Sequence, residues 1–142
     1  MRLIKKLNKW ANSHAYYPID ILRISLGVFL IYKGIFFFRN PSFLVELLNE
    51  MQFDSFSALM WSVHYVGMFH FVGGLMLVFG LLTRLSLIVQ LPIFIGAVTL
   101  NFFGTIHPQN LLESSLVFLV SIFFILYGSG KHSLDYDLKM QA

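Results

Sequence analysis

The segment IDILRISLGVFLIYKGIFFF, residues 19–38, decides the fold class of this 142-residue chain. An α-helix rises about 1.5 Å per residue, so roughly 20 residues cross the ~30 Å hydrocarbon core of a bilayer. The segment has this length, and its charged residues are Asp20, Arg23 and Lys33. It is therefore predicted to form a transmembrane helix.

Three further apolar runs have a similar length and composition. They are residues 59–82, 85–103 and 111–127. The longest polar stretch, residues 39–57, is shorter than the ~40 residues that a chain usually needs to bury a core of its own. The sequence therefore predicts an all-α protein with a single domain, residues 1–142, built as a four-helix transmembrane bundle.

The composition supports this class and excludes others. Hydrophobic residues make up 57% of the chain and charged residues 12%, and the mean hydropathy is +0.73, outside the range of ordinary soluble domains. The net charge is +3, but the basic residues gather at the amino terminus and form no groove. No nucleic-acid partner is expected, and the lipid bilayer is the expected one. Because the chain lacks cysteine, it cannot itself carry a disulfide, a thiolate metal site or cysteine redox chemistry.

The distribution of basic residues predicts the orientation, because lysine and arginine favour cytoplasmic loops. Residues 39–57 contain one basic residue, and residues 105–110 contain none. These two connections are expected on the outer side, and both termini in the cytoplasm. The basic residues on the cytoplasmic side would be Arg2, Lys5, Lys6, Lys9, Arg84, Lys131 and Lys139.

Two shorter segments have the pattern of amphipathic helices. In residues 1–10, apolar and basic residues occupy opposite helix faces, which is typical of a helix that lies on an anionic membrane surface. In the outer loop, a helix that begins at Pro41 would carry one apolar stripe from Phe43 to Met51. This second helix could cover the bundle or contact a partner subunit.

Polar residues within the spans are the candidate site. Lys33, His70, Asn101 and Glu113 come from four different spans, and all lie in the outer half of the predicted bundle. Lys33 and Glu113 offer opposite charges at a similar depth, and His70 could hydrogen-bond to Asn101 or Glu113. One interpretation is a pocket for a quinone headgroup, a proton or an anion. The other is a buried network that fixes the helix register.

A second polar pair, Asp20 and Arg23, is predicted near the cytoplasmic side, three residues apart on one helix face. Arg23 could reach the lipid headgroups and pair with Asp20, or it could point inward and hold an anion. No metal site is predicted. A set of His70, His107 and Glu113 is conceivable but lacks the spacing of a known metal motif.

Several motifs together resemble the DoxX family of small four-helix membrane proteins. They are RISLGVFLIYKG (residues 23–34), HFVGG (70–74), GLLTR (80–84), Glu113 and GSGKHSLD (128–135). The resemblance extends over most of the chain, from about Pro18 to Leu138. Many DoxX members carry a glycine three residues before the lysine that ends the first span, whereas here Lys33 directly precedes Gly34.

The resemblance implies a location in a prokaryotic cytoplasmic (inner) membrane and a link to redox chemistry. Some members belong to thiosulfate:quinone oxidoreductase or to other membrane-associated oxidoreductase assemblies. The leading hypothesis is a subunit that anchors or assists a larger, redox-linked assembly of membrane or membrane-associated proteins, without activity alone. The alternative is an oxidoreductase subunit that binds a quinone or small anion in the outer pocket. No intrinsic cofactor is expected, and a quinone is the candidate ligand.

Overall fold

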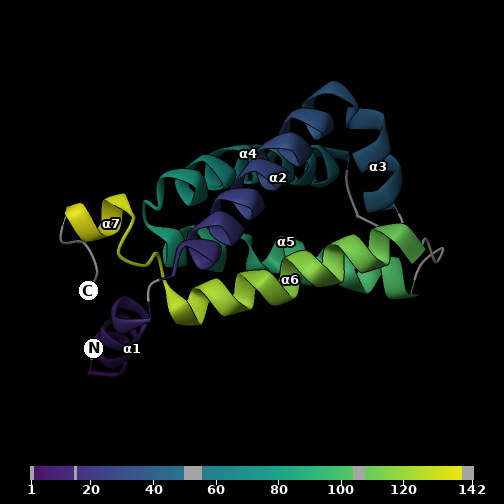
Figure 1. Cartoon of the computed structure of the whole chain (residues 1–142). Helices are drawn as coiled ribbons and strands as arrows, with labels where there is room; N and C mark the ends of the chain where they lie inside the picture. Colours follow the sequence, from purple (N-terminus) through teal and green to yellow (C-terminus); the bar gives the residue numbers. More distant parts are fainter. Residues whose placement is uncertain (1, 15, 50–55, 104–107, 139–142) are drawn as a thin grey trace.

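The structure, a computed structural model, describes residues 2–14, 16–49, 56–103 and 108–138. These segments are helical and contain no β-strand, so the predicted all-α class is confirmed (Figure 1). The helices are α1 (Arg2–Ser13), α2 (Tyr17–Arg39), α3 (Pro41–Asn49), α4 (Phe56–Phe79), α5 (Thr83–Phe103), α6 (Pro108–Tyr127) and α7 (Leu134–Asp137).

Four of these helices, α2, α4, α5 and α6, are long and apolar enough to cross a membrane. They contain 20 to 24 residues each, which corresponds to a length of about 30–36 Å. Many large apolar side chains on them point away from the rest of the protein, as expected of surfaces that lipid chains contact. The protein is therefore an integral membrane protein.

The second span differs from its predicted boundaries, residues 59–82. Helix α4 begins three residues earlier and ends at Phe79. Gly80 (φ +66°) and Leu82 (φ +46°) then adopt the left-handed backbone conformation, which ends a right-handed helix. Leu81 and Leu82 prolong the apolar run, but hydropathy does not report backbone conformation. The predicted end was therefore too late by one turn.

Helices α2 and α4 pack directly against each other through glycines. A Cβ atom added at Gly27 would lie 2.8 Å from the Gly74 carbonyl oxygen, and one at Gly34 would lie 2.7 Å from the Phe71 backbone nitrogen. Such distances leave no space for a side chain. The glycines therefore permit the close backbone approach on which helix packing in lipid depends.

Helices α5 and α6 form a second pair (Figure 1). Arg84, in the first turn of α5, donates from Nε to the Ile125 carbonyl (3.0 Å) and from Nη2 to the Leu126 carbonyl (3.2 Å). It thereby binds carbonyls at the end of α6 that have no partner within the helix. The fully buried apolar residues between the two pairs are Leu30, Leu77, Leu87 and Phe124.

Helix α3 lies across the end of the bundle opposite the termini (Figure 1). Leu44 is buried and packs in one cluster with Leu59 of α4, and the Phe43 ring contacts the Phe36 ring with their centroids 5.6 Å apart. The predicted amphipathic helix that begins at Pro41 is thus confirmed, and it covers this end of the bundle. Met51, the last residue of the predicted stripe, lies outside the described residues.

Helices α1 and α7 lie at the other end, together with both termini (Figure 1). The Tyr127 hydroxyl donates to the Ala11 carbonyl (3.1 Å), so α1 is attached to the end of α6. Its Leu3 and Trp10 side chains remain exposed, as expected of an amphipathic helix in the membrane interface. The predicted amphipathic N-terminal helix is therefore confirmed.

Candidate functional site

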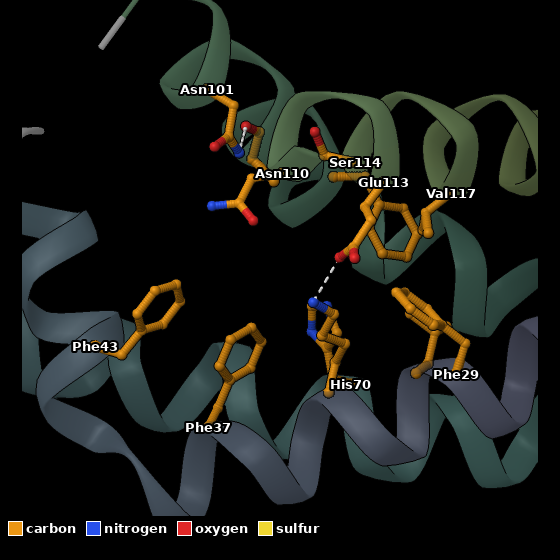
Figure 2. A pocket seen from close by; sticks show the side chains of 13 residues that line it. Phe29, Phe37, Phe43, His70, Asn101, Asn110, Glu113, Ser114 and Val117 are labelled. Atoms are coloured by element: carbon orange, nitrogen blue, oxygen red, sulfur yellow. Dashed lines mark hydrogen bonds and ion pairs between the residues drawn. The ribbon is translucent and has the colours of Figure 1, made fainter. Parts of the chain in front are cut away.

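A cavity of about 110 Å³ lies between the α2–α4 pair and the α5–α6 pair, near α3 (Figure 2). All four predicted site residues of the outer group contribute to its wall, and each comes from a different span. Aromatic rings supply much of the remaining surface. The four predicted residues are Lys33, His70, Asn101 and Glu113, and the aromatic residues are Phe29, Phe37, Phe43 and Phe94.

Lys33 and Glu113 form an ion pair at this cavity. The Lys33 Nζ lies 2.7 Å from the Glu113 Oε2, and the side chains are 27% and 46% exposed. The dashed line that leaves the labelled Glu113 in Figure 2 marks this ion pair. The Lys33 ammonium also lies over the Phe29 ring, 5.4 Å from its centroid, which is within the range of a cation–π contact. The lysine charge is thus already compensated within the protein.

His70 is held in one orientation from α4. Its Nδ1 lies 2.9 Å from the Val66 carbonyl oxygen, and its ring contacts Phe37 and Phe94 edge to face. A carbonyl can only accept a hydrogen bond, so Nδ1 carries a proton, and in the uncharged form of the ring Nε2 is an acceptor. The expected hydrogen bond of His70 with Asn101 or Glu113 is not formed. Nδ1 is bound to Val66 within its own helix, Asn101 donates to Ala97, and Glu113 accepts from Lys33.

Asn101 and two residues that the sequence analysis missed complete the polar part of the wall. The Asn101 Nδ2 donates to the Ala97 carbonyl (2.7 Å), one turn earlier in α5. Asn110 and Ser114 line the cavity from α6. Asn110 stands three residues before Glu113 and four before Ser114, and both spacings bring side chains together on one side of a helix. This spacing was the signal that could have identified them.

Arg23 and Asp20 lie at the opposite end of the bundle and take no part in the cavity. Arg23 is only 2% exposed, so the prediction that it reaches the lipid headgroups is wrong. It donates from Nη1 to the Leu77 carbonyl and from Nη2 to the His132 carbonyl, both at 2.9 Å. The Asp20 Oδ1 lies 3.8 Å from the Arg23 Nη2. Two backbone carbonyls thus hold the guanidinium inside the protein, where it connects α2, α4 and the C-terminal segment.

Asp135 is a second residue that the sequence analysis missed. It is buried, and its carboxylate accepts from the backbone N–H groups of Leu82 (2.7 Å) and Thr83 (3.3 Å) at the start of α5. His132 Nδ1 lies 2.7 Å from Asp20 Oδ2. These contacts bind the C-terminal segment to the bundle. Because they join segments distant in the chain, no local pattern reveals them.

No cluster of three or more His, Cys, Asp or Glu side chains that could hold a metal ion occurs among the described residues. His107, which completed the conceivable set with His70 and Glu113, lies outside them. The groups that the cavity offers are an ammonium–carboxylate pair, an imidazole and amide groups, all against aromatic walls.

Comparisons with known proteins identify the family. The family model described as DoxX matches residues 19–105, which include α3, α4, α5 and all but the first two residues of α2, and hence Lys33, His70 and Asn101. Helix α6 with Glu113 lies beyond the matched segment. No curated protein and no solved structure matches the chain. The match extends over more than half of the sequence, and the chain belongs to the DoxX family.

Proposed function

We propose that this protein binds a quinone ring in the cavity between its two helix pairs. The observation that carries the proposal is the placement of the Lys33–Glu113 ion pair and of His70, whose Nδ1 is bound to the Val66 carbonyl, in one aromatic-walled cavity. A quinone ring is flat and apolar and has a polar oxygen at each end. Aromatic walls with a few polar groups are suited to such a ligand.

The size of the cavity sets a condition on this proposal. An engineered protein cavity of about 150 Å³ binds benzene, and the present cavity has about 110 Å³. A quinone ring would therefore enter it only with outward movement of the side chains around it. The Phe37 and Phe94 rings, which contact His70 edge to face, provide the apolar faces.

The polar residues have complementary roles toward such a ring. A quinone is reduced to its hydroquinone by two electrons and two protons. Lys33 keeps ammonium protons beyond the one directed at Glu113, and it can donate them in hydrogen bonds to a ring oxygen. His70 can accept a hydrogen bond at Nε2 from a ring hydroxyl. The two residues can therefore recognise both redox forms of the ligand.

The electrons would come from another protein, since the chain has no cysteine with which to accept them. We therefore propose an accessory role, in which the chain anchors or assists a larger redox-linked assembly in the prokaryotic cytoplasmic membrane. This part is tested by mass spectrometry of protein purified gently from its native membrane. Stoichiometric redox subunits would support it, and protein recovered without partners would contradict it.

A small anion is the weaker candidate ligand. An anion needs a positive charge that is free to pair with it, whereas the Lys33 charge is paired with Glu113 at 2.7 Å. An anion in this cavity would also face the Glu113 carboxylate, which repels it. The quinone ring, which carries no net charge, meets neither obstacle.

The binding proposal is tested by titrating purified protein in mild detergent with a chainless benzoquinone. We expect wild-type protein to bind it, and His70→Asn and Glu113→Gln each to weaken binding by about tenfold or more. His64→Asn is the matched control, because His64 Nδ1 also contacts the carbonyl four residues earlier, that of Met60 at 2.8 Å, but His64 does not line the cavity.

The melting temperature of each variant separates the two interpretations of the polar group. Variants that lose quinone binding at a temperature where they are still fully folded would support the ligand site. If His70→Asn and Glu113→Gln only lower the melting temperature and bind the ring normally, the polar residues serve the fold. That result would contradict the proposed function.

A further inference from the structure

A second hollow, a groove of about 240 Å³, lies between α2 and α6 beside the cavity. Apart from Ser25 and Glu113, the residues that line it are apolar. Phe29, Glu113 and Val117 belong to the walls of both the cavity and the groove. The two spaces are therefore neighbours, with the Lys33–Glu113 ion pair at their junction.

The groove exists because the helices are packed closely within each pair but not at the boundary between the two pairs. Helices α2 and α4 are in backbone contact at Gly27 and Gly74, and α5 packs along α6. Helices α2 and α6, in contrast, barely touch. The groove walls include Leu112 and Leu116 of α6, which are largely exposed. In the membrane, this opening faces the lipid chains.

The groove extends away from the ion pair toward the end of the bundle that holds the termini. Its residues on α6 run from Leu112 to Val120, a distance of about 12 Å along the helix axis. On α2 they run back from Phe29 to Leu22. A chain that begins at the cavity can therefore follow the groove for about two helical turns.

We propose that the hydrophobic chain of a membrane quinone lies in this groove while its ring occupies the cavity, so that the ligand enters sideways from the bilayer. The inference rests on the proposed function. The polar groups at the cavity and the apolar walls of the groove together match a molecule with one polar head and one apolar chain. A water-soluble ligand has no apolar chain with which to contact the groove.

The experiment compares a chainless benzoquinone with a decyl-chain benzoquinone of the same ring, by titration of full-length protein at one detergent concentration. Ser25→Phe adds bulk to the groove wall from α2, and Leu116→Phe does so from α6. Both positions are exposed, so neither change disturbs the core. Val28→Phe is the matched control, because Val28 is an exposed residue of α2 that lies outside the groove.

We expect each groove variant to weaken binding of the decyl-chain quinone by about tenfold, and to leave binding of the chainless ring within about twofold of wild type. Val28→Phe should change neither affinity. If both groove variants bind the decyl-chain quinone as wild type does, the chain lies elsewhere and the inference fails while the proposed function stands. Wild-type protein that binds neither quinone would overturn both.

Discussion

Lys33 Nζ and Glu113 Oε2 lie 2.7 Å apart, and they join the first and the last of the four membrane-spanning helices. The contact links residues that are 80 positions apart in the chain. Because both side chains adjoin apolar walls, each charge depends on the other for compensation. The pair should therefore contribute to stability as well as to ligand binding.

A double-mutant cycle measures this dependence. Lys33→Met and Glu113→Gln should each lower the free energy of unfolding by about 1–3 kcal/mol, since each leaves one charge unpaired in apolar surroundings. The double variant should be less destabilised than the sum of the two, with a coupling of about 0.5–3 kcal/mol. Reversible unfolding in mixed micelles gives these values. Additive effects would show that the two residues do not stabilise each other.

The packing of α2 on α4 is tested by a substitution at Gly34. The new Cβ of Gly34→Ala would lie 2.7 Å from the Phe71 backbone nitrogen, which forces the helices apart and should destabilise the protein by about 1–3 kcal/mol. Gly96→Ala is the control, since a Cβ there has no atom within 4 Å. It should be neutral or stabilising, by up to about 1 kcal/mol. Equal effects of the two changes in unfolding experiments would exclude close packing at Gly34.

The role of Asp135 is tested by comparing substitutions at Asp135 and at Asp137, two residues later in α7. Asp135→Ala removes the acceptor of the Leu82 and Thr83 N–H groups, and should lower the free energy of unfolding by about 1–3 kcal/mol. Asp137→Ala, at an exposed position two residues later, should change it by less than about 0.5 kcal/mol. If both variants have the same free energy of unfolding, the hydrogen bonds of Asp135 do not stabilise the protein.

The orientation is tested with introduced cysteines, because the chain has none of its own. Ser42→Cys lies in α3 and Lys131→Cys at the end that holds the termini, and both positions are exposed. With both termini in the cytoplasm, a membrane-impermeant thiol reagent should label the first variant in intact cells. It should label the second only after the membrane is opened. The reverse pattern would place the termini outside.

The fold and the Lys33–Glu113 ion pair were accessible from the sequence for the same reason. A bilayer requires long apolar helices, which make the spans visible, and it makes charges within them conspicuous. Lys33 and Glu113 have opposite signs and a similar depth, which was enough to suggest a partner for each. Depth alone could not show that His70 bonds Val66 of its own helix.

The opposite end of the bundle could not be derived in this way. The position of Arg23 along α2 gave its depth, but its contacts depend on how the turn after α4 and the C-terminal segment fold around it. Asp135 is one of two acidic residues near the end of the chain, and nothing local separates it from Asp137. Tertiary contacts between distant segments decide both cases.

The position of Arg23 also bears on how the protein is made. The guanidinium belongs to the first membrane-spanning helix, yet it is bonded to the His132 carbonyl, 109 residues later. At about 5–20 residues per second, a ribosome needs about 5–20 s to reach that partner. During biogenesis the first helix is therefore in the membrane before the carbonyl that binds Arg23 has been synthesised. Final closure of the bundle becomes possible only as synthesis of the chain ends.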